Sequence, residues 1–278
     1  MDRMKSTILL AALALAVMLP WPPAAAQSVP PAPDAVSKTC SDAAEAGRNP
    51  TALPNTARAL RDRKRIKVLA MGATPLNERD QANGHYALVE KALESGYKGL
   101  DVEIIDRGVS GEIARDGAER MRTEVALTRP DLVFWQVGVA DALALTPPAE
   151  LKETLTQTVK WLKAHDVDVV LIGLRYIRSM ARDQAFQQLR TTIAEVVRDE
   201  AILRVGHYAA VEALDRIRRQ QGDVTSELDL TEAGSTCLAD FLSRALAVGL
   251  FSKPRAGLPG APQPSPDHAS DARASRLI

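Results

Sequence analysis

The chain has few aromatic residues and no excess of charge of either sign. Aromatic residues make up 4% of the sequence, and 35 basic residues balance 35 acidic ones. Nucleic-acid binding relies on a basic surface that neutralises phosphates and often on aromatic rings that stack on bases. We therefore expect no nucleic acid among the partners of this protein.

Cysteine is also scarce, since the sequence contains only Cys40 and Cys237. Two cysteines this far apart do not form a thiolate metal centre of the usual spacing. In an oxidising compartment a single pair tends to form one disulfide, which here would join a segment near the N-terminus to the last predicted helix. The alternative is two buried, unpaired thiols, because sequence does not give the distance between the two Cα atoms.

The apolar run at the N-terminus is too short to cross a bilayer, which needs about 20 residues. The longest N-terminal run is 8–19, preceded by Arg3 and Lys5 and followed by Ala24-Ala25-Ala26. This arrangement is typical of a cleavable export signal covering residues 1–26. We expect a bacterial protein that is periplasmic or secreted, with no membrane span after cleavage; an uncleaved anchor helix is the alternative.

The rest of the chain predicts one folded domain between two loose segments. Residues 27–57 are rich in proline, alanine and serine, and residues 251–278 combine proline, glycine and mixed charge. Such compositions favour disorder over a packed core. We expect a loose lead-in over 27–57, a domain over 58–250 and a disordered tail over 251–278.

Strand-like and helix-like patterns alternate along the predicted domain. Short apolar segments predict strands at 65–71, 100–106, 132–137, 167–174 and 202–205. Helical spacing predicts helices at 56–63, 86–94, 112–127, from 148 onward, at 184–200, at 209–219 and near the C-terminus. Alternation of this kind indicates an α/β protein, and we predict a three-layer α/β/α sandwich with a central parallel sheet in flavodoxin-like order.

Four turns that follow predicted strands or precede the last helix should meet at one edge of this sheet. Their surroundings read VLAMGAT, DRGVSGE, PDLVFWQVGVADAL and, at the start of the last helix, GSTCLADFL. In order and spacing these segments resemble the SGNH (GDSL) hydrolases, over residues 66–246. The resemblance implies the fold of that superfamily and a site that deacylates lipids, acylated sugars or small esters, without a metal or other cofactor.

The residues that would form this site depart from the superfamily pattern. The resemblance places Thr74 where the nucleophilic serine stands and Ala140 where an asparagine amide completes the oxyanion hole. Ser226 and Asp229 occupy the places of the catalytic aspartate and histidine, and only Gly111, whose backbone N–H is an oxyanion donor, matches the pattern. We therefore expect an impaired enzyme that binds a cell-envelope glycan, an acylated small molecule or a partner protein.

Two alternatives stay open for this site. Thr74 could act as a weak nucleophile if burial raised the pKa of Asp229 enough for it to serve as a base. An ordinary aspartate is too acidic to take a hydroxyl proton at neutral pH, so we favour the impaired site. The other alternative is a structural scaffold without a ligand.

A few further residues near the predicted strand ends could contribute to binding. Asp141 could contact a ligand or organise a loop, although capping the turn that follows it is the simpler interpretation. Arg175 and Tyr176 could line the site, but we expect exposed loop residues there, and Trp135 should lie in the core. The sequence has four histidines, which lack metal-ligand spacing. We expect each of them to be a solvated or a capping residue: His85, His165, His207 and His268.

Overall fold

A parallel five-stranded sheet forms the centre of the fold. The computed structural model describes residues 51–72, 84–205, 208–220, 222 and 232–251. The strands run in the order β2-β1-β3-β4-β5 and pair in parallel throughout. Their bounds are Arg65–Gly72 (β1), Asp101–Asp106 (β2), Leu132–Gln136 (β3), Asp168–Ile172 (β4) and Leu203–Val205 (β5). This is the flavodoxin-like order, so that prediction is confirmed.

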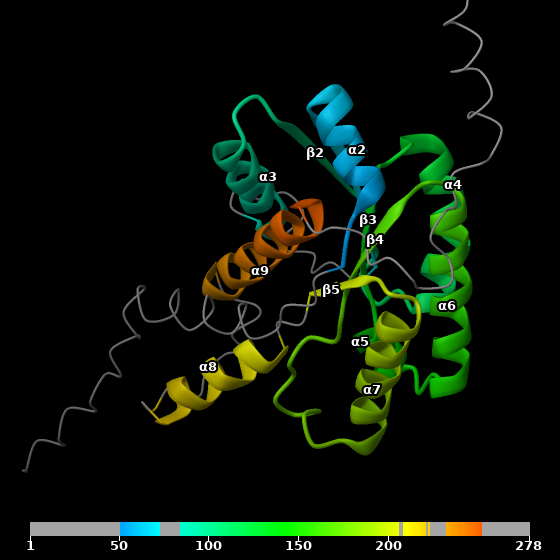
Figure 1. Cartoon of the computed structure of the whole chain (residues 1–278). Helices are drawn as coiled ribbons and strands as arrows, with labels where there is room; N and C mark the ends of the chain where they lie inside the picture. Colours follow the sequence, from blue (N-terminus) through cyan, green and yellow to red (C-terminus); the bar gives the residue numbers. More distant parts are fainter. Residues whose placement is uncertain (1–50, 73–83, 206–207, 221, 223–231, 252–278) are drawn as a thin grey trace, which may run out of the picture.

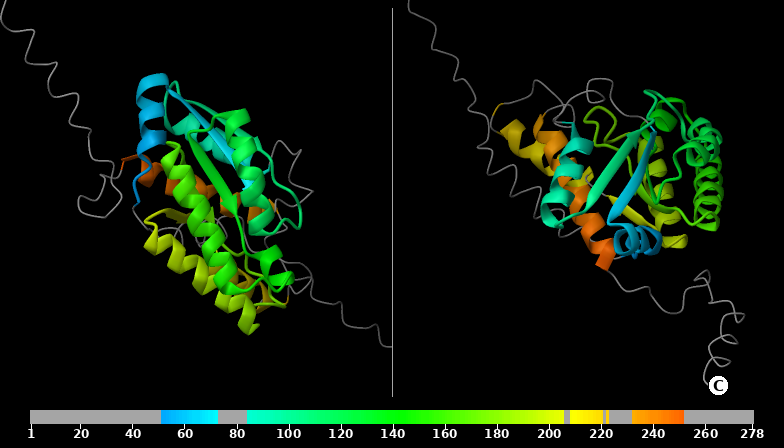
Figure 2. Two further views of the ribbon diagram at one scale, coloured as in Figure 1. Left: turned by 90° about the vertical axis from the view of Figure 1, so that its right-hand side faces the viewer. Right: turned by 90° about the horizontal axis from the view of Figure 1, so that it is seen from above.

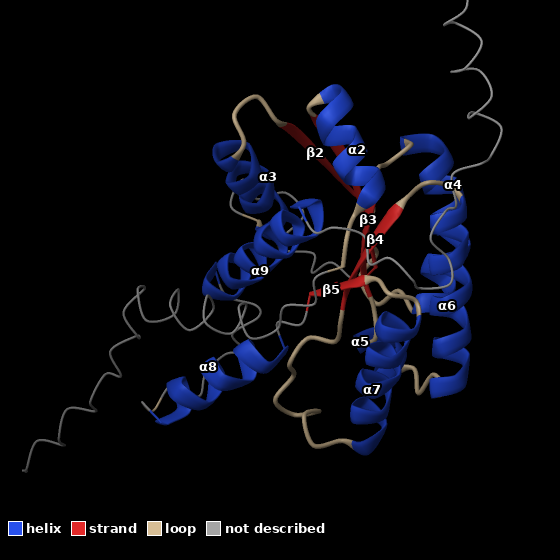
Figure 3. Ribbon diagram, in the orientation of Figure 1, coloured by secondary structure: helices blue, strands red, loops and turns tan. Residues whose placement is uncertain are grey.

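Helices cover both faces of the sheet (Figures 1 and 3). On one face α4 packs on β1, α6 packs on β4, and α7 packs on α6; on the other, α3 packs on β2 while α9 contacts α3 and β5. The two further views in Figure 2 show the same three layers. The helices are α2 (Pro54–Arg63), α3 (His85–Gly96), α4 (Ala114–Thr128), α5 (Val139–Leu143), α6 (Pro148–Ala164), α7 (Gln184–Asp199), α8 (Tyr208–Gln220) and α9 (Glu232–Phe251).

Strand β3 lies in the middle of this arrangement. Its residues are buried from Leu132 to Gln136, as its continuous apolar run predicts for a parallel strand covered on both faces. Trp135 is fully buried, so its assignment to the core is confirmed. Because β3 is held by β1 on one side and β4 on the other, its C-terminal end is a fixed point on which neighbouring loops are placed.

Helix α2 begins earlier than the sequence pattern predicts. It starts at Pro54, where proline is tolerated because the N–H groups of a first helical turn lack intrahelical acceptors. The preceding Leu53 is buried, and its N–H donates to the Gly249 carbonyl at 3.0 Å. Residues 51–57, the end of the expected loose lead-in, are therefore part of the fold. Residues 27–50 and 252–278 lie outside the described residues.

Helix α9 is long and apolar, with a mean hydropathy of 1.2 over Gly234–Phe251. By length and composition alone, this stretch could cross a membrane, but half of it is buried inside the protein. Leu242 and Leu246 are buried, and the helix packs against α3 and β5. These contacts make α9 a core helix of the domain.

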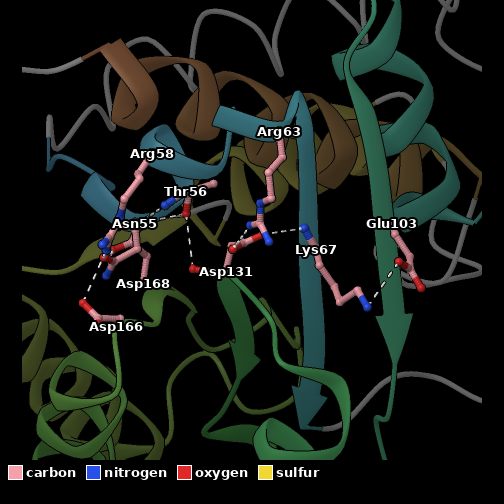
Figure 4. Close-up of polar contacts among 9 residues, drawn as sticks. All are labelled: Asn55, Thr56, Arg58, Arg63, Lys67, Glu103, Asp131, Asp166 and Asp168. Carbon is pink, nitrogen blue, oxygen red and sulfur yellow. Dashed lines mark hydrogen bonds and ion pairs between the residues drawn. The ribbon is translucent and has the colours of Figure 1, made fainter. Parts of the chain in front are cut away.

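The other end of the sheet, where the strands begin, is fastened to α2 by Asp168 (Figure 4). One carboxylate oxygen of Asp168 accepts hydrogen bonds from the backbone N–H and the hydroxyl of Thr56, both at 2.8 Å, and the other accepts one from Asn55 Nδ2 at 3.1 Å. Leu53, at the N-cap position, has no side chain that could do this. Asp168 thus supplies from a distant strand the acceptor that the helix start needs.

Asp131 makes a second link at the same end of the sheet. Its carboxylate accepts a hydrogen bond from the backbone N–H of Lys67 at 3.0 Å and pairs with Arg63 at the end of α2. Lys67 in turn lies 3.6 Å from the carboxylate of Glu103 on β2 (Figure 4). Helix α2 is therefore tied to the starts of β1, β3 and β4, on the side opposite the predicted site.

Candidate functional site

The C-terminal ends of β1 and β3 lie side by side, with no room for a side chain at the last residue of β1. Gly72, the last residue of β1, pairs in register with Gln136, the last residue of β3. Gly72 has a φ of +96°, and a Cβ atom added there would lie 1.9 Å from the carbonyl oxygen of Gln136. Only glycine fits this position, which is the motif glycine two residues before Thr74.

The loop after β2 continues along the end of β1. The N–H of Arg107 donates to the Ala70 carbonyl at 2.8 Å, and the N–H of Val109 donates to the Gly72 carbonyl at 2.9 Å. Gly111 follows in an exposed turn with a φ of +78° and open space around its Cβ position. No acceptor for its N–H is present among the described residues. The backbone N–H of Gly111 is the group to which the sequence resemblance assigns the role of oxyanion donor.

An ion pair holds this loop to the first turns of α4. The carboxylate of Glu112, next to Gly111, accepts from Arg120 Nε at 2.8 Å and from Arg120 Nη2 at 3.1 Å. Arg120 Nη2 also donates to the Arg107 carbonyl at 2.7 Å, and its hydrogen bond to Glu112 raises the pKa of the guanidinium. A two-point contact of this kind is geometrically specific, so Arg120 helps to fix the position of the Gly111 turn.

Asp141 joins the turn after β3 to the loop after β2. It is 1% exposed, and its two oxygens accept hydrogen bonds from the N–H groups of Ala114 (2.9 Å) and Gly138 (3.0 Å). The Gly138 bond closes the first turn of α5, as a helix-start residue should, and the Ala114 bond spans two loops. Burial raises the pKa of Asp141, although the backbone hydrogen bonds lower it. Asp141 thus caps the start of α5 and also holds the loop after β2 to the turn after β3.

Ala140 occupies the position that the superfamily pattern gives to the second oxyanion donor. It is the second residue of the short helix α5 and is 7% exposed. Its side chain is a methyl group, which donates no hydrogen bond. Gly111 and Ala140 thus belong to the two segments that Asp141 connects, the loop after β2 and the first turn of α5.

The loop after β4 differs from the expectation of exposed residues. Tyr176 is buried and its hydroxyl donates to Asp215 Oδ2 at 3.2 Å, because the loop folds against α8. Arg178 pairs with the same buried carboxylate, with Nε 3.1 Å from each oxygen. Arg175, in the same loop, is half-buried. For Tyr176 the prediction of an exposed residue is wrong, since an aspartate on a later helix provides its partner.

The histidines fall into three groups. His165 is exposed at the C-cap of α6, with Nδ1 2.7 Å from the Trp161 carbonyl, which confirms a capping role. His85 is only 2% exposed, so of the two expected roles, solvated or capping, the solvated one does not apply to it; it begins α3 with its ring centre 4.0 Å from that of Tyr86. His207 and His268 lie outside the described residues.

Several predicted site residues cannot be placed. Thr74, Ser226, Asp229 and Cys40 lie outside the described residues, so the structure brings together only Gly111 and Ala140 of the five superfamily positions. Within the described ranges no group of three His, Cys, Asp or Glu side chains could hold a metal ion. Sequence reasoning missed two features of this region, the Glu112–Arg120 pair and the buried Gln136. The signal for Gln136 was a lone polar residue in an apolar strand.

Comparisons with known proteins agree with this architecture. Residues 39–251 match the model of the non-GDSL lipase-like family. Esterase TesA of Pseudomonas aeruginosa is 28% identical over 111 residues, covering 37% of this chain and 54% of that protein. An arylesterase of Vibrio mimicus is 29% identical over 77 residues, covering 28% of this chain and 38% of that protein. The chain thus spans about half, or less, of the length of these curated relatives.

Solved structures show the same fold. An acetyl xylan esterase, AlAXEase, superimposes with a TM-score of 0.58 at 18% identity, covering 65% of this chain and all of that one (100%). The crystal structure of TesA gives a TM-score of 0.54 at 20% identity, covering 65% of this chain and 97% of that one. These likenesses confirm the predicted three-layer α/β/α fold.

Proposed function

Because the chain belongs to the non-GDSL lipase-like family, we propose that it is an exported protein that keeps the hydrolase fold but hydrolyses esters poorly or not at all. Its strand-tip site, by which we mean the ends of β1 and β3 with the Gly111 and Gly138–Asp141 turns, binds a cell-envelope glycan or a partner protein. The proposal rests on the retained framework of this site beside altered catalytic positions.

Ala140 is the observation that carries the proposal. The turn around it is built as a hydrolase needs, with Asp141 holding both neighbouring loops, yet the side chain at position 140 donates nothing. Losing one oxyanion donor typically costs about 2.7–4 kcal/mol of transition-state stabilisation. Position 140 therefore keeps the backbone arrangement of the site but lacks the side-chain hydrogen-bond donor.

The sequence supports the same conclusion at the remaining positions. A threonine hydroxyl at position 74 needs a positioned base, and Asp229, at the place of the superfamily histidine, is normally ionised and weakly basic. The alternative function is a weak or unconventional esterase in which Thr74 is the nucleophile. It is favoured by the backbone N–H of Gly111, which has no acceptor in the described part of the chain and would still stabilise an oxyanion.

Hydrolysis of 4-nitrophenyl acetate and butyrate by purified protein separates the two functions. We expect the wild type and a Thr74→Ala variant to release nitrophenol at the same rate, no more than a few-fold above buffer. A parallel assay with an active bacterial esterase shows that the conditions permit turnover. Turnover by the wild type well above buffer that is lost in Thr74→Ala contradicts the proposal and establishes the esterase.

The support for a glycan ligand comes from a protein of the same fold and from the overall charge of the chain. One protein of the same fold is an acetyl xylan esterase, so this framework accommodates acylated sugars in at least one case. The ligand that we propose for this protein is a sugar that does not have to carry an acyl ester. The neutral overall charge of the chain is consistent with a ligand that is not strongly ionic.

Export predicts two covalent changes that intact-mass spectrometry detects together. Protein recovered from a bacterial periplasm should lack residues 1–26, and reduction should add the mass of two hydrogens as the Cys40–Cys237 bridge opens. Cys237 is buried on α9, where a bridge would hold the N-terminal segment to the core helix. Recovery of the full-length chain, or of a mature chain with no mass change on reduction, would contradict export or the disulfide, respectively.

A further inference from the structure

Gln136 is a buried polar residue with an unpaired oxygen. It is 5% exposed at the end of β3, and its side-chain carbonyl Oε1 has no hydrogen-bond partner among the described residues. The residues around it in the chain, from Leu132 to Trp135 and then Val137, are apolar and buried. An apolar residue would complete this strand without leaving a carbonyl unpaired.

Its position places Gln136 in the strand-tip site. It pairs in register with Gly72, and the Gly72 carbonyl accepts a hydrogen bond from Val109, so the three backbones lie side by side at the strand ends. Gly138 follows two residues later, at the turn that Asp141 closes. Gln136 therefore lies between the loop that carries Gly111 and the turn that carries Ala140.

The side of the sheet that Gln136 faces follows from the alternation along a strand. Phe134, two residues earlier, stacks on Tyr86 at a ring-centre distance of 6.1 Å, and Tyr86 is the second residue of α3. The Gln136 side chain is thus on the α3 face of the sheet, near the start of that helix. Trp135 faces α4 instead, since its indole nitrogen lies 3.4 Å from the Cβ position of Gly117.

A buried carbonyl without a partner costs free energy, and such groups in native proteins call for a reason. We propose that the Gln136 carboxamide is a ligand-binding group of the strand-tip site, and that it pairs with a hydroxyl group of a neutral sugar. This inference rests on the proposed binding function and names the chemistry of its ligand. The free protein leaves the carbonyl unpaired, and the bound sugar supplies the missing hydrogen bond.

The chemistry of the site favours a neutral, hydroxylated group. A carboxamide offers an acceptor and a donor side by side, which matches a hydroxyl that both donates and accepts. An ion would have to lose its water beside apolar residues, which is expensive without a countercharge. Neighbouring charges are already engaged, since Asp141 accepts two backbone hydrogen bonds and Glu112 pairs with Arg120.

The first part of the test measures stability without any ligand. Gln136→Leu and the unbranched Gln136→Met both remove the unpaired carbonyl, and we expect the melting temperature to rise by about 2–4 °C. The matched control is Gln187→Leu, because the Gln187 carboxamide has partners and donates to the Ala181 carbonyl and the Tyr208 hydroxyl. The control should melt at a lower temperature than the wild type. A fall in both Gln136 variants would show that this amide is a structural contact and would overturn the proposal.

The second part measures binding by calorimetry with xylotetraose and with tetra-N-acetylchitotetraose, which distinguish a plant-type from an envelope-type sugar. We expect the wild type and Gln187→Leu to bind at least one sugar equally well, and both Gln136 variants to bind it about tenfold more weakly. Wild-type protein that binds neither sugar, or Gln136 variants that bind as well as the wild type, would overturn the proposal. Ester hydrolysis that depends on Thr74 would instead overturn the non-catalytic function and leave the role of Gln136 intact.

Discussion

Replacing Gly72 with alanine is expected to lower the free energy of unfolding by about 4 kcal/mol or more. The added Cβ would lie 1.9 Å from the carbonyl oxygen of Gln136, and a φ of +96° is unfavourable for any residue with a side chain. Because the clash is with backbone in the centre of the sheet, no side-chain rotation relieves it. Denaturant unfolding followed by circular dichroism measures the change.

Gly99→Ala is the matched control for this substitution. Gly99 also has a positive φ, +79°, but nothing lies within 4 Å of its Cβ position. This variant carries the backbone strain without the clash, so we expect a cost of about 1 kcal/mol. Similar losses in the two variants would mean that β1 and β3 can separate at their ends, contrary to the close contact in the structure.

Asp168 is expected to make the stability of the protein depend on pH between about 4 and 7. Burial raises the pKa of its carboxyl group from 3.8 to about 6, although hydrogen bonds from Thr56 and Asn55 lower it. The folded state therefore binds this proton more tightly than the unfolded state. Asp168 therefore adds about 3 kcal/mol to the free energy of unfolding below pH 4, where it is protonated in both states. This contribution is lost as the pH rises through 6.

The comparison of wild type with Asp168→Asn isolates this contribution. Unfolding free energies at pH 4.5, 6 and 7.5 should show the wild type gaining stability relative to the variant as the pH falls. Asp166→Asn serves as the control, because the Asp166 side chain is exposed and its carboxylate lies 3.4 Å from Arg58 Nη2. A difference between wild type and Asp168→Asn that is constant over this range, or that shrinks on acidification, would contradict the expectation.

Much of the fold could be predicted because local pattern and tertiary structure agree. The continuous apolar run of β3 marked a central strand, and strands alternating with helices indicated the parallel order that the structure has. The errors occur where a distant partner decides the outcome. Helix α2 starts at Pro54 because Asp168, on β4, accepts the hydrogen bonds of its first turn, and no local pattern contains that information.

The candidate site was harder to predict for the same reason. The motif positions Gly111 and Ala140 were recognisable from their spacing, but the buried position of Tyr176 depends on Asp215, which comes much later in the chain. The position of His85 at a helix start was predicted correctly, but its burial was not, because burial depends on how α3 packs. In the sequence Gln136 is one polar residue in an apolar strand, and only the structure shows that its side chain is buried, with 5% of the residue exposed.

The contact between Gly72 and Gln136 also bears on how this family would be expected to diverge. The glycine that introduces the nucleophile motif is required by the packing of two backbones, whatever residue stands two positions later. Mutation could therefore remove the reactive hydroxyl while purifying selection for folding continued to preserve the glycine. A database search keyed on that glycine would retrieve active and inactive descendants alike, and only the neighbouring side chains would tell them apart.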